Sequence, residues 1–201
     1  MSLFRKIFGG TSDSSKSEKD KEEKSPFTPE VKLPIDEMFT HNFKSNGGKF
    51  IYCESLEEVS ENFLNILEEN DWFESEAICY DSRLIYLLDE NKINHQNTKD
   101  PKFMLSSCEN LIADEGSILF SSNQFRHFKP NDLPTNMVVF GTTSQLVGTK
   151  SDGLRYIKNR YDKEYPSNIT TIKYFEEVKE QDFLHYGSCH KNLYLLLLED
   201  L

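Results

Sequence analysis

The chain has 201 residues, of which 37% are hydrophobic and 12% aromatic, so it can fill one core but not two large ones. Its formal net charge is -11, from 34 acidic and 23 basic residues, and this excess of acid opposes a nucleic-acid-binding surface. No apolar run approaches the roughly 20 residues that cross a bilayer. The apolar run in residues 1–10 is too short for the core of a signal peptide. We therefore expect a cytoplasmic protein with no nucleic-acid partner and no transmembrane segment.

The first 30 residues differ in composition from the rest of the chain. Residues 9–30 (GGTSDSSKSEKDKEEKSPFTPE) are nearly free of apolar groups, so they cannot bury enough surface to offset the entropy of ordering them. We predict a disordered tether there. It follows a short amphipathic head, residues 1–8, which either docks on a partner or membrane surface or is a frayed terminus. The expected organisation is a head and tether over residues 1–30 and one folded domain over residues 31–201.

Strands and helices alternate along the predicted domain. Ser55 followed by Glu58 is a capping-box signature, and the helix behind it carries an apolar stripe of period 3.6 that ends at Leu67. The alternation favours an α/β fold with an open, largely parallel sheet and flanking helices. Besides this helix, we predict a short helix around residues 84–88, a helix over 144–161, and strands over 49–53, 76–80, 102–107, 117–122, 136–141, 168–173 and 192–200.

An acidic turn, Asp114-Glu115-Gly116, separates two apolar runs in the segment SCENLIADEGSILFSSNQ. A tight hairpin explains the glycine, because Gly116 can adopt a positive φ. It explains the two carboxylates only loosely. Asp114 or Glu115 would serve as a general base or a ligand contact if a cleft raised its pKa. The residues alone leave both interpretations open.

A second candidate follows the strand predicted over residues 136–141. Gly141, Thr142, Thr143 and Ser144 precede a predicted helix start, where backbone N–H groups and hydroxyls can hold an anion. The same residues are also ordinary helix caps. The chain has no GxGxxG, GxxxxGK[ST] or GxSxG motif, so neither a dinucleotide loop, a P-loop nor a hydrolase elbow is indicated.

The cysteines and histidines indicate no metal site. Cys53, Cys79, Cys108 and Cys189 form no CxxC pair, so we expect free, mostly buried thiols and neither a zinc site nor an iron–sulfur cluster. The histidines are scattered. His190, beside Cys189 and just before the last predicted strand, is the exception, and its segment is either part of a site or a plain glycine-containing turn.

Three segments of the chain resemble the lactate-utilisation (LUD-domain) family of the LutC/YkgG type: CENLIADEGSILFSS, LPTNMVVFGTTSQLVGTKSDGLRYI and PSNITTIK…YGSCHKNLYLLLLED. Residues 112–117 match the family's Ile-Ala-Asp/Glu-Thr-Gly-Thr segment, with Glu115 in the place of threonine. Residues 133–147 follow the family's next strand and helix. Gly187 and residues 193–198 match its glycine-rich turn and terminal strand. The resemblance covers roughly residues 35–201.

The resemblance implies a fold similar to the NagB/RpiA/CoA-transferase-like group, with ligands at strand ends. Members of the family take part in oxidising L-lactate to pyruvate beside separate iron–sulfur subunits, so any clusters are expected in partner subunits and no cofactor in this chain. A small organic acid or a phosphorylated ligand is the expected small-molecule partner. The resemblance makes Asp114 and Glu115 the candidate catalytic residues, and the candidate ligand contacts are Gly116, Ser117, Gly141, Thr142, Thr143, Ser144, Gly187 and His190.

The chain also departs from the family pattern. KYFEEVKEQDF replaces the family's Gly-Pro-Ser-x-Thr-Ala-Asp-Ile-Glu segment, and the terminal Gly-x-His-Gly-Pro has become Gly187-Ser188-Cys189-His190-Lys191. Three hypotheses follow. The first is a divergent LUD-domain protein that serves lactate oxidation as a non-redox subunit or accessory factor. The second is a stand-alone enzyme acting on a phosphorylated or CoA-linked small molecule. The third is an interaction module recruited through residues 1–8.

Overall fold

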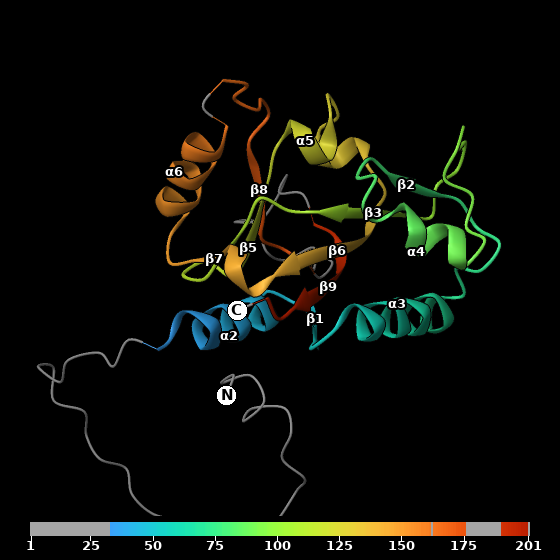
Figure 1. The fold of residues 1–201 in the computed structure, drawn as a ribbon, viewed down its shortest axis with the longest axis horizontal. Coiled ribbons are helices and arrows are strands. Elements are labelled where there is room, and N and C mark those ends of the chain that lie inside the picture. The colour runs from blue at the N-terminus through green and yellow to red at the C-terminus, as the bar shows by residue number, and fades with distance from the viewer. Residues whose placement is uncertain (1–32, 162, 176–189, 201) are drawn as a thin grey trace, which may run out of the picture. The chain divides into compact units, whose positions relative to one another are not determined.

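Five parallel strands form the central sheet of the domain (Figure 1). The computed structural model describes residues 33–161, 163–175 and 190–200. Every pairing in this sheet is parallel, which confirms the predicted α/β fold. In spatial order the strands are β1 (Lys49–Cys53), β9 (Asn192–Leu198), β6 (Asn136–Thr142), β3 (Phe103–Ser107) and β2 (Ala77–Cys79).

Helices α3 (Leu56–Asn70) and α4 (Ile85–Glu90) cover one face of this sheet. Half of the capping box predicted for α3 forms. The Ser55 side chain accepts a hydrogen bond from the Glu58 backbone N–H at 3.2 Å, but the Glu58 carboxylate accepts from the backbone N–H of Glu54, one residue before the cap, at 2.8 Å. Trp72, just after α3, stacks on Phe103 of β3 with ring centroids 4.7 Å apart. The apolar stripe of α3 packs in one core with side chains of the central strands, among them Phe103, Leu105, Val138, Tyr194 and Leu196.

A second sheet of four short strands covers the other face, whereas the sequence predicted a single sheet that would include the strands at 117–122 and 168–173. The two sheets meet closely at Gly141 of β6. A Cβ atom at this position would lie 3.5 Å from Leu111 of the second sheet, the same distance as from Leu195 of the neighbouring strand β9. The β4–β5 and β5–β8 pairings are antiparallel, and β4–β7 is parallel. The order is β7 (Leu146–Val147), β4 (Asn110–Ile112), β5 (Ser117–Phe120) and β8 (Thr170–Ile172).

Helix α6 (Lys150–Arg160) packs on the outer face of the second sheet, where Ile157 is buried with Ile112 and Leu119. The prediction that this helix starts at Ser144 is wrong. Residues 143–145 form a 3₁₀ turn, and β7 follows because its two apolar residues pair with β4. The helix begins only after Thr149, whose side chain accepts a hydrogen bond from the backbone N–H of Asp152.

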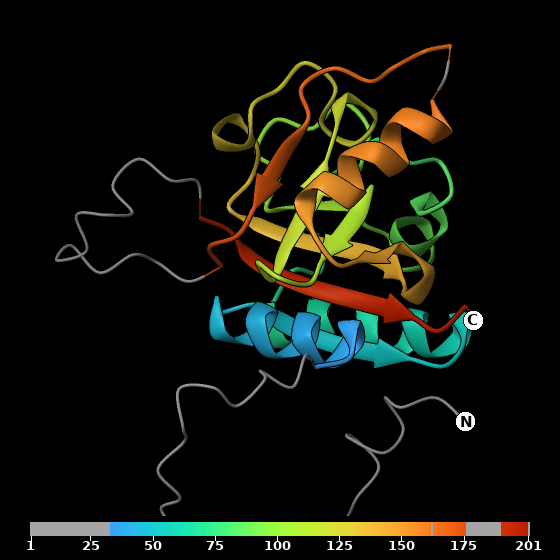
Figure 2. The same cartoon turned by 90° about the vertical axis from the view of Figure 1, so that its left-hand side faces the viewer.

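Helix α2 (Ile35–Ser45), which the sequence analysis did not predict, contacts both β1 and β7 and so lies along the edges of both sheets (Figure 2). Its buried side chains include Phe39 and Phe43. The short helix α5 (Ser122–Phe125) and a 3₁₀ turn (Pro130–Asp132) connect β5 to β6.

Residues 35–201 form one compact unit, and residues 1–30, with the predicted head and tether, lie outside the described part. Within the described residues, no helix is both long enough and apolar enough to cross a bilayer.

Candidate functional site

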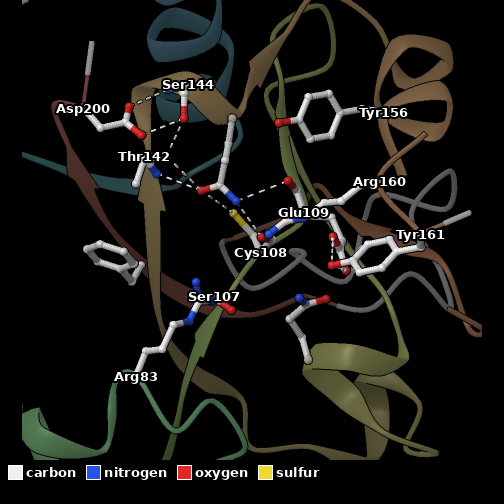
Figure 3. Close-up of a pocket in the computed structure, with 13 residues that line it drawn as sticks. Arg83, Ser107, Cys108, Glu109, Thr142, Ser144, Tyr156, Arg160, Tyr161 and Asp200 are labelled. Carbon is white, nitrogen blue, oxygen red and sulfur yellow. Dashed lines mark hydrogen bonds between the residues drawn. The ribbon is translucent and has the colours of Figure 1, made fainter. Parts of the chain in front are cut away.

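A cavity of about 450 Å³ lies at the carboxyl ends of the central strands (Figure 3). In a parallel sheet, the segments that follow the strands all lie at the carboxyl ends of the strands, which is where α/β folds commonly bind ligands. The volume falls within the range of small-molecule sites, about 300 to 1,000 Å³. The cavity is lined by Arg83 after β2, by Ser107, Cys108 and Glu109 at the end of β3, by Thr142, Ser144 and Gln145 after β6, by Asp200 after β9, and by Tyr156, Arg160 and Tyr161 of the α6 segment.

Gln145 holds the segments after β3 and β6 together. Its Oε1 accepts a hydrogen bond from the Thr142 N–H at 2.8 Å, and its Nε2 donates to the Cys108 carbonyl at 2.7 Å. Burial, and next the charge of Glu109, raise the pKa of the Cys108 thiol far above its usual range. Cys108 is also only 3% exposed, which makes its thiol a poor nucleophile.

The hydroxyl groups after β6 bind a carboxylate of the protein itself. The Thr143 hydroxyl and the Ser144 backbone N–H donate to Oδ1 of Asp200 at 2.9 and 2.8 Å, and the Ser144 hydroxyl donates to Oδ2 at 2.6 Å. Burial raises the pKa of the Asp200 carboxyl, but the hydrogen bonds from Ser144 and Thr143 outweigh it and hold the pKa below its ordinary value. The anion position predicted from residues 141–144 is thus occupied by Asp200.

Asp81 holds Arg83 at the cavity. The Arg83 guanidinium donates to both carboxylate oxygens of Asp81, at 2.9 and 2.6 Å, and the Ser107 hydroxyl donates to Oδ2 at 2.7 Å. The hydrogen bonds from Arg83, helped by Ser107 and opposed by burial, lower the pKa of Asp81 to about 2. Asp81 is therefore ionised at neutral pH and fixes the guanidinium beside the cavity.

Glu109 is only 1% exposed, yet it borders the cavity. Its Oε1 accepts hydrogen bonds from the Ser121 hydroxyl at 2.6 Å and from Asn123 Nδ2 at 3.2 Å, and its Oε2 accepts one from the Tyr161 hydroxyl at 3.1 Å. Burial, and next the charge of Glu109, raise the pKa of the Tyr161 phenol. Tyr161 therefore keeps its proton at neutral pH and donates it toward Glu109 (Figure 3).

Arg160 extends from the end of α6 to the cavity (Figure 3). Its guanidinium lies 5.5 Å from the centroid of the Tyr161 ring. In residues 33–161, 163–175 and 190–200, no carboxylate lies within 4.0 Å of it. The cavity thus combines a guanidinium without a carboxylate partner in this part of the chain, a second guanidinium held by Asp81, and a buried carboxylate.

The structure distributes the predicted site residues over three places. Thr142 and Ser144 line the cavity, and Gly141 and Thr143 are buried beside them. The turn 114–117 lies elsewhere, against α2. Asn42 Nδ2 donates to the carbonyls of Ala113 and Asp114 at 2.8 and 3.2 Å, and Asn46 Nδ2 donates to those of Glu115 and Gly116 at 2.8 and 3.1 Å. The catalytic role of Asp114 and Glu115 and the ligand role of Ser117 stay predictions.

His190 lies at the amino ends of the central strands, away from the cavity at their carboxyl ends. A cavity of about 420 Å³ there is lined by His190 and by the first residues of three strands: Lys49, Asn136 and Asn192. Gly187 and Cys189 lie outside the described residues. His190 and the hydroxyl cluster after β6 are therefore not brought together.

Of the residues that line the cavity, only Thr142 and Ser144 were predicted as site residues, and Arg83, Glu109, Arg160 and Tyr161 are among those that the sequence analysis missed. One signal was available for Glu109: it follows the predicted strand 102–107 by two positions, and ligand sites gather where parallel strands end. No comparable signal marks Arg160 or Tyr161, because they reach the cavity only through the packing of α6 on the second sheet.

Neither a protein-family model nor a curated protein matches this sequence. A solved structure is similar: the crystal structure, at 1.70 Å resolution, of a DUF162 family protein from Deinococcus radiodurans. The two chains are 12% identical with a TM-score of 0.56, and the match covers 82% of this chain and 96% of the other. DUF162 is the LUD-domain family. At this identity the likeness shows the fold alone, a fold that is consistent with the resemblance of the sequence to LUD-domain proteins.

Proposed function

We propose that this protein binds a small organic acid in the cavity at the carboxyl ends of the central strands. The observation that carries the proposal is the pair of guanidinium groups, Arg83 and Arg160, beside one cavity of about 450 Å³. Guanidinium groups bind carboxylates through charge-assisted hydrogen bonds. Arg160 has no carboxylate within 4.0 Å in the described part of the chain, so it is available to a ligand.

We further propose that this binding serves the oxidation of L-lactate to pyruvate. In that role the chain is a non-redox subunit or accessory factor, and separate iron–sulfur subunits carry the electrons. The support is the resemblance of residues 35–201 to LUD-domain proteins, together with the fold shared with a DUF162 family protein. Native mass spectrometry of the protein purified gently from its own cells tests this role, because the proposal requires co-purified iron–sulfur subunits.

The enzyme hypothesis, with a phosphorylated or CoA-linked substrate, has less support from the geometry. It assigns the phosphate to Thr142, Thr143 and Ser144. Thr143 and Ser144 already bind the Asp200 carboxylate through three hydrogen bonds, so a phosphate would have to displace it. This contact argues against the hydroxyl cluster as a phosphate site.

Calorimetric titration with L-lactate tests the cavity. The variant Arg160→Gln should weaken binding at least about tenfold, because it removes a charge-assisted hydrogen bond. Arg155→Gln is the matched control, since Arg155 lies on the same helix but its guanidinium contacts Asp152 instead of lining the cavity. Equal affinity of wild type and Arg160→Gln, or no heat of binding at millimolar lactate, would contradict the assignment.

A further inference from the structure

The cavity holds a carboxylate that none of the proposals above uses. Glu109 is 1% exposed, and it borders the cavity. A carboxylate offers about four acceptor positions. Ser121 and Asn123 take two of them on Oε1. The Tyr161 hydroxyl lies 3.1 Å from Oε2 and 3.4 Å from Oε1 and has one proton to donate, so Oε2 retains acceptor capacity.

No basic side chain of the described residues forms an ion pair with Glu109. Within residues 33–161, 163–175 and 190–200, no basic side chain lies within 4.0 Å of Glu109. Its three donors are neutral groups: a serine hydroxyl, an asparagine amide and a phenol. Burying a charge with incomplete pairing costs free energy, and each additional donor recovers part of that cost. A ligand that brings a donor to Glu109 therefore gains affinity from it.

Arg160 supplies the complementary half of the site. It precedes Tyr161 in the chain, and Tyr161 donates to Glu109, so the end of α6 brings a positive group and the partner of the buried carboxylate to the same cavity. A ligand that satisfies both groups carries a carboxylate for Arg160 and, close to it, a hydrogen-bond donor for Glu109.

We propose that Glu109 determines which acids the cavity binds, by accepting a hydrogen bond from a hydroxyl or ammonium group on the carbon beside the ligand's carboxylate. The inference rests on the proposed binding of an organic acid. It predicts that 2-hydroxy or 2-amino acids bind in preference to 2-oxo acids and unsubstituted acids. A 2-oxo acid turns a carbonyl oxygen toward Glu109, which places two acceptors against each other. An unsubstituted acid leaves the acceptor unused.

Four three-carbon acids of equal chain length test this preference by calorimetric titration of the full chain: L-lactate, L-alanine, pyruvate and propionate. We expect lactate or alanine to bind at least about tenfold more tightly than pyruvate and propionate, because a site built to accept a hydrogen bond rejects analogues that lack the donor. Tighter binding of lactate identifies a hydroxyl as the donor. Tighter binding of alanine identifies an ammonium.

The variant Glu109→Gln tests the residue directly. Glutamine has nearly the same shape but presents an amide N–H₂, so the preference should shift at least about tenfold toward pyruvate. Glu68→Gln, an exposed position on α3, is the matched control and should keep the wild-type ranking. A thermal melt checks that each variant folds. If Glu109→Gln does not fold, the order in which wild type binds the four acids tests the proposal by itself.

The outcomes separate the two proposals. Binding of all four acids by wild type within about twofold of one another, or an unchanged ranking in a folded Glu109→Gln variant, would overturn the role of Glu109 and leave organic-acid binding intact. Failure of all four acids to bind would overturn the proposed function, and the role of Glu109 would fall with it.

Discussion

At the scale of single residues, the carboxylates around the cavity differ in what surrounds them. Asp81 accepts hydrogen bonds from the Arg83 guanidinium and the Ser107 hydroxyl, whereas Glu109 accepts only from neutral donors. Asp200 accepts two hydroxyls and a backbone N–H. Asp81 therefore anchors a cation that can face a ligand, and Glu109 remains the carboxylate on which a ligand can act.

Asp81→Asn should lower the free energy of unfolding at pH 7 by about 1 to 2 kcal/mol. This range is smaller than the full pKa shift implies, because the Arg83 side chain is exposed and solvent screens its interaction with Asp81. The folded-state pKa of Asp81 is lowered to about 2 from 3.8. Its stabilisation is therefore complete above the unfolded-state pKa and is lost as the pH falls from about 4 to 2. Urea unfolding measured across this pH range should show the free energy of unfolding of wild type falling to that of Asp81→Asn.

Asp114→Asn is the control for this measurement, because Asp114 is an exposed carboxylate on the β4–β5 turn, outside the cavity. Its free energy of unfolding at pH 7 should differ from wild type by less than about 0.5 kcal/mol. A difference between wild type and Asp81→Asn that does not change with pH would show that the carboxylate charge contributes nothing.

At the scale of elements, the acidic turn is a docking point between a hairpin and a helix. Gly116 has φ of +59°, as the hairpin interpretation requires. Its Cα also lies so close to α2 that an added Cβ would come within 2.3 Å of the Asn42 carbonyl carbon and 2.4 Å of the Phe43 nitrogen. Asn42 and Asn46 of α2 then bind the carbonyls of the turn. These contacts explain the glycine and the sharp turn without any ligand.

Gly116→Ala should therefore lower the free energy of unfolding by about 2 to 4 kcal/mol, because it combines a left-handed backbone with a clash against helix backbone. Gly148→Ala is the matched control, since a Cβ there meets only Asp152 Oδ2, at an ordinary 3.5 Å. Urea denaturation of both variants measures the difference. Equal stability of the two would mean that α2 moves away at little cost.

The elements also show which parts of the fold a sequence can predict. The strands of the central sheet were predictable because β3, β6 and β9 contain continuous apolar runs of three, four and six residues. In the second sheet, the strands predicted over residues 117–122 and 168–173 correspond to β5 and β8, but β4, β7 and the separation into two sheets were not predictable, because β4 and β7 have only two or three residues and are defined by their partners. The start of α6 was misplaced because the hydroxyl cluster at residues 142–144 resembles a helix cap.

The same limit applies to the site. A run such as residues 141–144 is contiguous and visible in the sequence, and Thr142 and Ser144 do reach the cavity. Glu109 and Tyr161, by contrast, are 52 positions apart and meet only because α6 packs over β4 and β5. A pair that is created by tertiary packing leaves no local pattern.

At the scale of the whole molecule, the question is whether partners bind the domain or the segment before it. Residues 35–201 form one compact unit, and residues 9–30 offer almost no apolar surface to a core. The lactate-oxidation proposal places partner contacts on the domain, whereas the interaction-module hypothesis places them on residues 1–8.

Deleting residues 1–30 distinguishes these hypotheses. We expect the shortened chain to keep a cooperative thermal melt, with a free energy of unfolding within about 0.5 kcal/mol of the full chain. Native mass spectrometry of both forms, purified from the protein's own cells, should show the same iron–sulfur subunits. Partners that are lost while the melt is unchanged would favour recruitment through residues 1–8, and loss of the melt would show that residues 1–30 support the domain.

The position of β9 has a consequence for how the molecule is made. Among the described strands, β1 lies at an edge of the central sheet and its one partner is β9, so Lys49 can pair only after Tyr194 has been synthesised, 145 positions later in the chain. Pairings between such distant segments form slowly. A growing chain that emerges from the ribosome therefore carries β1 without a neighbour and β6 with one side open until almost the whole domain has been synthesised. During that interval, the exposed strand edges are where the nascent protein is most open to aggregation and most dependent on a chaperone.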